Sequence, residues 1–173
     1  MTTITTQATK KVEINPITRL EGHGKIEIIL NDDGNVENAY LQIPILRGFE
    51  KFCEGRPVEE IPRIVTRICG VCPEAHHLAS AKAADMLYDA TPPIPAQKLR
   101  ELFYAAHMVH SHIAHFYALA GPDFVLGPDA APEERNILGV INKVGVTIGK
   151  DVIKHRSLAQ KIQRMIGGKY DSR

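Results

Sequence analysis

The sequence lacks the features that mark membrane-spanning, secreted and nucleic-acid-binding proteins. No apolar run approaches the roughly 20 residues that a membrane-spanning helix needs. The net charge is only +1, which provides no broad basic surface for nucleic acid or for an anionic membrane. The opening residues, MTTITTQATKK, contain no apolar stretch and so do not form a secretory signal. We therefore expect a cytoplasmic protein with neither a nucleic-acid nor a membrane partner.

Cysteine is also scarce, with three in 173 residues. Two of them, Cys69 and Cys72, are separated by only two residues. Such a small and uneven set does not suit a disulfide framework, and a close pair of thiols points toward metal or redox chemistry.

The composition is that of an ordinary globular protein, with 44% apolar and 24% charged residues. The polar, threonine-rich residues 1–10 predict a flexible tail. The remainder, 11–173, is expected to form a single domain, with a β-region at about 11–45 and a helical region at about 57–167. We predict an α+β fold in which a small antiparallel sheet precedes a mainly helical bundle.

The β-region shows alternating apolar and charged residues around Val12 and along 25–30. A turn signal at 31–35, NDDGN, leads into a returning strand at 36–43. These patterns predict a hairpin preceded by a third strand.

The helical region contains four predicted helices. Pro73 suits the first position of a helix that ends near Asp89. The clearest periodic segment is 96–120, whose apolar residues extend around the helix, so we expect burial on more than one side. Two further helices are predicted, one from Pro132 to near Gly145 and one over about 150–166.

The most informative stretch is RICGVCPEAHH, residues 67–77. Two thiolates with the spacing of Cys69 and Cys72 can bind one metal ion together. Such soft ligands favour zinc, nickel, copper(I) or iron. Pro73 places both sulfurs at a helix entrance. There the partial positive charge of the helix N-terminus and the positive charge of Arg67 favour the ligating thiolate form. His76 lies one helical turn after Cys72, so its ring can approach that sulfur.

The spacing by itself leaves three interpretations open. One is a structural zinc site that uses Cys53, Cys69, Cys72 and His76, and the spacing alone favours it. Another is a thioredoxin-like dithiol, although no βαβ frame is evident around it. The third is one half of a larger thiolate-bound metal centre.

The wider sequence resembles the N-terminal part of nickel-iron hydrogenase large subunits. The resemblance begins with Arg67-x-Cys69-Gly70-Val71-Cys72-x-x-x-His76 and extends to other motifs in the family's order: PITRLEGH at 16–23, RGFE at 47–50, and SHIAHFY at 111–117 followed by PD at 122–123. The sequence of these motifs and their surroundings is most similar to the soluble, cytoplasmic branch of the family, whose members work with heterodisulfide reductase or with a diaphorase. The resemblance implies the N-terminal portion of the large-subunit fold and a part in the reversible oxidation of dihydrogen.

For the metal centre, the resemblance implies that Cys69 is a terminal nickel ligand and that Cys72 bridges nickel and iron. His76 is expected to hydrogen-bond the bridging sulfur. The iron is expected to carry cyanide and carbonyl ligands.

Three residues outside this group also acquire implied roles. Glu21 is expected to be the first proton acceptor beyond the metals, Glu50 a ligand to a nearby magnesium ion, and Arg67 a neighbour of the cyanide and carbonyl ligands. The implied partner is a small subunit whose iron-sulfur clusters carry the electrons away. Without the resemblance, Glu21 and Glu50 would be interpreted as surface charges.

Four histidines, His107, His110, His112 and His115, fall within one predicted helix. Helical geometry places His110 on the apolar stripe and turns His112 and His115 roughly the other way. We therefore expect packing or interface residues and no metal site there. Cys53 is expected to be a buried thiol without a metal.

The family's large subunits carry a second cysteine pair, in the form Asp-Pro-Cys-x-x-Cys-x-x-His, which residues 1–173 do not contain. The predicted centre is therefore incomplete in this chain. Either another chain supplies the second pair, or the chain is a truncated product without activity of its own. The alternatives to an enzyme component are a zinc-stabilised module and a non-catalytic interaction subunit.

Overall fold

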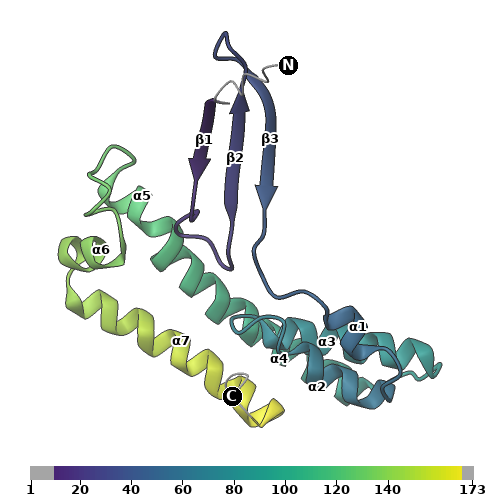
Figure 1. The fold of residues 1–173 in the computed structure, drawn as a ribbon. Helices are drawn as coiled ribbons and strands as arrows, with labels where there is room; N and C mark the ends of the chain where they lie inside the picture. The colour runs from purple at the N-terminus through teal and green to yellow at the C-terminus, as the bar shows by residue number, and fades with distance from the viewer. Residues whose placement is uncertain (1–9, 169–173) are drawn as a thin grey trace, which may run out of the picture. The chain divides into compact units, whose positions relative to one another are not determined.

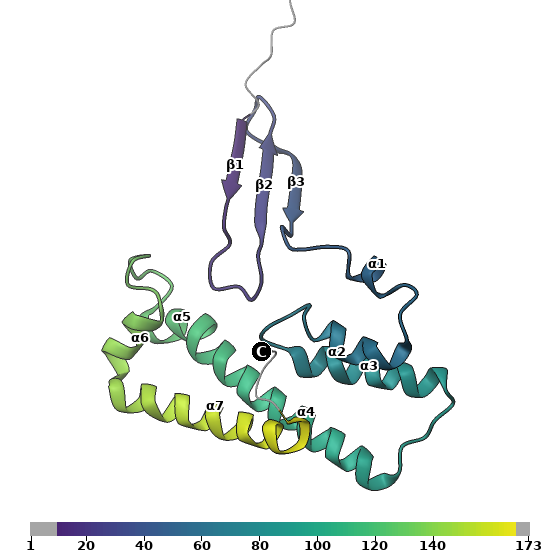
Figure 2. The same cartoon turned by 60° about the horizontal axis from the view of Figure 1, so that its bottom comes forward.

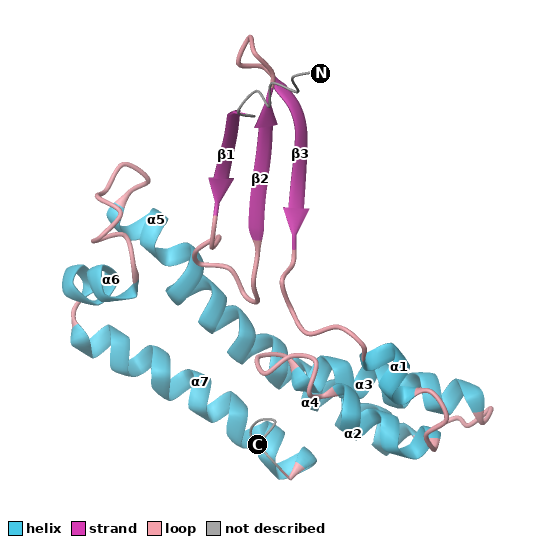
Figure 3. Cartoon of the chain, in the orientation of Figure 1, coloured by secondary structure: helices cyan, strands magenta, loops and turns pink. Residues whose placement is uncertain are grey.

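The computed structural model describes residues 10–168, which divide into two compact units. We call residues 10–47 the sheet unit and residues 48–168 the helical unit, and describe each by itself (Figures 1 and 3). The predicted fold class, a small antiparallel sheet followed by helices, is confirmed. The expected flexible tail lies outside the described residues except for Lys10, which opens the first strand.

The sheet unit is a three-stranded antiparallel sheet of order β1-β2-β3, with β1 at Lys10–Ile14, β2 at Lys25–Leu30 and β3 at Val36–Gln42. The turn between β2 and β3 closes where the Asn35 backbone N–H donates to the Asn31 side chain, at 2.9 Å. Gly34 adopts a φ of 83° in this turn, a conformation that glycine tolerates. The predicted hairpin with a preceding third strand is therefore confirmed.

Two lysines and two glutamates form a charge network on this sheet. Glu13 and Glu27 face each other across β1 and β2, an arrangement that would be repulsive on its own. The Lys11 ammonium lies 2.7 Å from both carboxylates, and the Lys25 ammonium lies 2.6 Å from Glu27 and 3.4 Å from Glu13. Hydrogen bonds from both lysines lower the pKa of Glu27 to about 2.

We predict that the Glu27 carboxyl stays ionised down to about pH 2, because two ammonium groups stabilise its charge. The folded pKa lies below the unfolded value of about 4.3, so the network stabilises the sheet above that pH and loses its effect as the pH falls toward 2. NMR titration of the Glu27 side chain measures this. K11M with K25M should return the pKa toward its ordinary value, whereas K51M in the helical unit should leave it unchanged; an unaltered pKa in the double variant would contradict the prediction.

The helical unit is a succession of helices joined by turns and loops. Its elements are α1 (Phe49–Cys53), the 3-10 turn η1 (Val58–Glu60), α2 (Ile61–Val65), α3 (Pro73–Leu87), α4 (Ile94–Ala114), the π-helical segment η2 (His115–Ala120), α5 (Gly121–Leu126), α6 (Ile137–Val144) and α7 (Val146–Gly167). No helix among the described residues combines the length and apolar character needed to cross a bilayer.

The long periodic segment forms α4 and continues into η2, as expected for a helix over 96–120. It packs against both α3 and α7, and Figures 1 and 2 show α7 running beside it. At Gly167, the last residue of α7, an added Cβ would lie 2.9 Å from the Phe103 ring, so a larger residue there would force that ring to shift. Covering from these two sides is nevertheless incomplete, because Leu99 and Val109 remain about half exposed.

Two helix starts differ from the prediction. The expected helix from Pro132 begins only at Ile137, because Asn136 is extended (φ −146°, ψ −179°) and caps the helix. The last helix begins at Val146 rather than near 150. It follows directly after Gly145, whose positive φ of 95° is not helical and so separates α6 from α7. The short helix α1 was not predicted at all.

Asn136 supplies a testable contribution to stability. Its side-chain oxygen accepts hydrogen bonds from the backbone N–H groups of Leu138 at 2.9 Å and Gly139 at 3.2 Å. N136A removes this cap and should lower the free energy of unfolding of the full chain by about 1 kcal/mol. The matched variant N136D keeps an accepting oxygen and should lose much less. Urea denaturation measures both, and equal stability of N136A and the wild type would disprove the capping role.

Candidate metal centre

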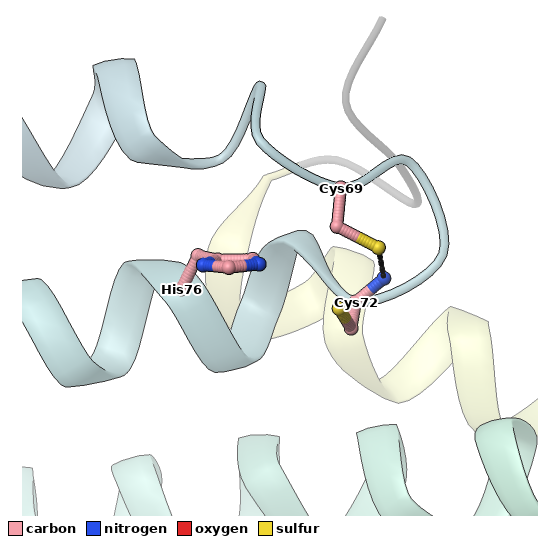
Figure 4. A group of neighbouring side chains, drawn as sticks. All are labelled: Cys69, Cys72 and His76. Carbon is pink, nitrogen blue, oxygen red and sulfur yellow. Dashed lines mark hydrogen bonds between the residues drawn. The ribbon is translucent and has the colours of Figure 1, made fainter. Parts of the chain in front are cut away.

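The two cysteines of the C-x-x-C motif lie at the entrance to α3. Cys69 is in the loop that follows α2, and Cys72 is the residue immediately before the helix, with φ −124° and ψ 42°. Pro73 takes the first helical position, as its fixed φ and missing N–H allow. His76 follows one turn into the helix, with its ring extended toward the cysteines (Figure 4).

We call Cys69, Cys72 and His76 the thiol cluster. Their ligand atoms all lie within 4.8 Å of one another, and all three residues are half-buried. The Cys72 backbone N–H donates to the Cys69 sulfur at 3.3 Å (Figure 4). Neither cysteine is in a disulfide. Two soft thiolates with an adjoining imidazole suit nickel, iron or zinc, and they fit one half of a four-thiolate nickel centre.

The structure argues against two of the interpretations that spacing left open. Cys53, on α1, is half-buried rather than buried, and it is not part of the thiol cluster, so the described residues do not assemble a Cys₃His zinc site. The motif also lies between two helices, whereas the described strands form a separate antiparallel sheet. That arrangement is not the βαβ frame of a thioredoxin-like dithiol.

The other candidate residues lie outside the thiol cluster. Arg67 is exposed and precedes Cys69 in the same loop, where its backbone N–H donates to the Ile64 carbonyl at 3.0 Å. Glu50 is exposed on α1 of the helical unit. Glu21 is exposed in the connection between β1 and β2, and it belongs to the sheet unit.

A protein-family model described as nickel-dependent hydrogenase matches residues 47–168, well over half of the chain. The chain belongs to the nickel-dependent hydrogenase family. A second model, described as HoxL-like, matches residues 11–46 of this hydrogenase-family chain. The two matches together span both the sheet unit and the helical unit.

Curated relatives agree with this assignment. The chain is 55% identical over 160 residues to an F420-non-reducing hydrogenase protein of Archaeoglobus profundus, covering 92% of this chain and 33% of that protein. It is 39% identical over 168 residues to the NAD-reducing hydrogenase HoxS subunit beta of Cupriavidus necator, covering 92% of this chain and 34% of that protein. The chain thus spans about a third of the length of these relatives.

Solved hydrogenase structures share this fold. An NAD+-reducing [NiFe]-hydrogenase in the H2-reduced state matches with a TM-score of 0.85 and 42% identity, over 96% of this chain and 37% of that one. The Ni-Fe-Se hydrogenase from D. vulgaris Hildenborough matches with a TM-score of 0.73 and 36% identity, over 94% and 35%. The hydrogenase-family chain is therefore a large-subunit component that covers only part of the whole.

A second group of potential ligands was missed by the sequence analysis. Glu74 on α3 and His107 and His110 on α4 bring their ligand atoms within 4.8 Å of one another, and all three are buried. We call them the interior polar cluster. The expectation that the α4 histidines do not converge is therefore wrong for His107 and His110. Their spacing of three residues, which puts both on one helix face, was the available signal.

The polar atoms of this cluster are poorly satisfied. His107 Nδ1 lies 3.0 Å from Glu74 Oε2, an ion-pair distance, but the approach does not meet hydrogen-bond geometry. Neither ring nitrogen of His110 has a hydrogen-bond partner among the described residues. Each buried polar group left in this way costs about 1–3 kcal/mol, so the cluster calls for an explanation.

The charge state of His110 follows from its surroundings. Burial lowers the pKa of His110 below its ordinary value, because it disfavours the charged imidazolium. The Glu74 carboxylate opposes this effect, while His107 and Arg156 add to it. Burial thus favours the neutral form of His110, which is the form that binds metals.

Proposed function

We propose that the chain contributes the N-terminal half of the nickel-iron thiolate site of a hydrogenase that catalyses the reversible oxidation of dihydrogen. The observation that carries the proposal is the thiol cluster, two cysteine sulfurs outside any disulfide and an imidazole converging at one helix entrance in a chain of this family. The second cysteine pair comes from the remainder of the large-subunit fold, which residues 1–173 do not include.

In this proposal Cys69 would hold nickel as a terminal ligand, and Cys72 would be a ligand shared by nickel and iron. Both would bind through the thiolate sulfur, which is the form of cysteine that ligates metals. His76 donates a hydrogen bond to the Cys72 sulfur and so tunes its electron donation. When bound, the metal pair supplies the Lewis-acidic position at which dihydrogen is split heterolytically.

Oxidation of one dihydrogen molecule releases two protons together with the two electrons. A cysteine thiolate would accept a proton at sulfur, and the Glu21 carboxylate would take each proton onward. Arg67 would lie beside the cyanide and carbonyl ligands of the iron, where its guanidinium could donate hydrogen bonds. Glu50 would provide a carboxylate oxygen to a magnesium ion, a hard cation that prefers oxygen ligands.

The two electrons leave through the iron-sulfur clusters of a small-subunit partner. A further heterodisulfide reductase or diaphorase module is the proposed acceptor, and the similarity to an NAD-reducing hydrogenase agrees with the diaphorase alternative. The chain is 55% identical to the F420-non-reducing hydrogenase protein of Archaeoglobus profundus and 39% identical to the NAD-reducing one.

The decisive experiment is metal analysis and hydrogen oxidation in the purified complex that contains this chain. C69S and C72S each remove one soft ligand, so both should lose nickel and lower hydrogen oxidation by at least about 100-fold. C53S is the matched control, because Cys53 lies outside the thiol cluster, and it should keep both metal and activity.

Two results of the same analysis would reject the proposal. Zinc alone, without nickel and iron, would identify a zinc-stabilised module. Absence of any metal at the cysteines would identify a non-catalytic interaction subunit.

The role of Glu21 has a separate test. E21Q keeps the size of the side chain but removes the proton acceptor, so turnover should fall by about 10²- to 10⁴-fold while nickel and iron are retained. E37Q, at an exposed glutamate of the same sheet unit, should retain full turnover. Hydrogen oxidation and metal content measured on the same samples separate the two effects. An E21Q enzyme with wild-type turnover would exclude Glu21 as the acceptor.

A further inference from the structure

The interior polar cluster has the composition of a metal site and is separate from the thiol cluster. Glu74, His107 and His110 are only 6%, 3% and 2% exposed, and they come from two packed helices. Their donor atoms converge to within 4.8 Å. Glu74 Oε2, His107 Nδ1 and both ring nitrogens of His110 lack hydrogen-bond partners among the described residues.

We propose that Glu74, His107 and His110 bind a divalent transition-metal ion of the zinc class inside the helical unit. Two imidazole nitrogens and one carboxylate oxygen are a ligand set that zinc uses, with bonds of about 2.0–2.2 Å. An ion at their centre would coordinate ligand atoms that make no hydrogen bond among the described residues, where the one close polar approach is that of His107 Nδ1 to Glu74 Oε2 at 3.0 Å. Because the ligands sit on helices rather than on loops, the site is largely formed by the fold itself.

One neighbouring charge opposes the ion. Arg156 on α7 acts electrostatically on His110, and its Nε is buried without a hydrogen-bond partner among the described residues. The Glu74 carboxylate attracts the ion, and the Arg156 guanidinium repels it. Arg156 as a whole is only half-buried, so water screens part of its charge, whereas Glu74 is buried.

The ion would have a structural role. The ligands are too little exposed for a substrate to reach them. Glu74 stands in the first turn of α3, and the two histidines stand on α4. A bound ion would fasten the start of α3 to α4, and with it the helix entrance that carries Cys72.

Cobalt(II) is the probe that separates the two clusters. Thiolates give Co²⁺ an intense sulfur-to-metal charge-transfer band, whereas imidazole and carboxylate ligands give only weak visible bands. The test uses the purified full chain as the C69S/C72S double variant, stripped with a chelator and titrated with Co²⁺. We expect one equivalent to bind with the weak visible bands alone, and Zn²⁺ to displace it.

Ligand variants in that background identify the residues. E74Q and H110N keep side chains of similar shape, so folding can be checked by circular dichroism, and each should weaken Co²⁺ binding by at least about 10- to 100-fold. H112N is the matched control, because His112 lies on the same helix but is exposed, with its ring 2.8 Å from the Met108 carbonyl oxygen. It should bind Co²⁺ like the parent.

Arg156 gives a prediction of opposite sign. R156Q removes the repelling charge and should tighten Co²⁺ binding.

Failure of the C69S/C72S chain to bind Co²⁺, or equal binding by parent and H110N, would overturn the proposal and indicate that water fills the cluster. Neither result depends on nickel at Cys69 and Cys72, so this site and the proposed hydrogenase function fail separately.

Discussion

The first turn of α3 is the constraint on which the candidate metal centre depends. Cys72 precedes the helix, Pro73 takes its first position, and Glu74 is buried against α4 near His107. The proline fixes one backbone dihedral, and the burial of Glu74 fixes the side of the helix that faces inward. The Cys72 sulfur is thereby held at the entrance, and the hydrogen bond from its N–H draws the Cys69 sulfur toward it.

Among the described residues, the interior of the helical unit holds as many buried polar or charged side chains as buried hydrophobic ones. The buried hydrophobic residues are mostly small, namely Leu78, Ala106, Val140 and Ala159, while the buried polar ones are Glu74, His107, His110 and Gln163. Large apolar side chains such as Met86, Phe124 and Met165 are instead exposed. In a chain spanning about a third of its relatives, this is the surface that the rest of a large subunit would cover.

Local signals predicted most of the secondary structure. The hairpin followed from the two-residue period of its strands and the turn at 31–35, and the start of α3 followed from Pro73. The start of α6 was predicted too early because Pro132 and the acidic residues after it resemble a first turn. Asn136 instead has an extended backbone, and its side chain caps a helix that begins at Ile137. The sequence pattern did not distinguish this later start from one at Pro132.

The sequence by itself determined the thiol cluster, because Cys69, Cys72 and His76 lie within two turns of chain and local helix geometry brings them together. It also determined the family, through motifs in a fixed order. Only the tertiary structure decided that Glu74 meets His107 and His110, since that meeting depends on how α3 packs on α4. Contacts between helices arise from whole packed faces, which a short spacing in the sequence does not encode.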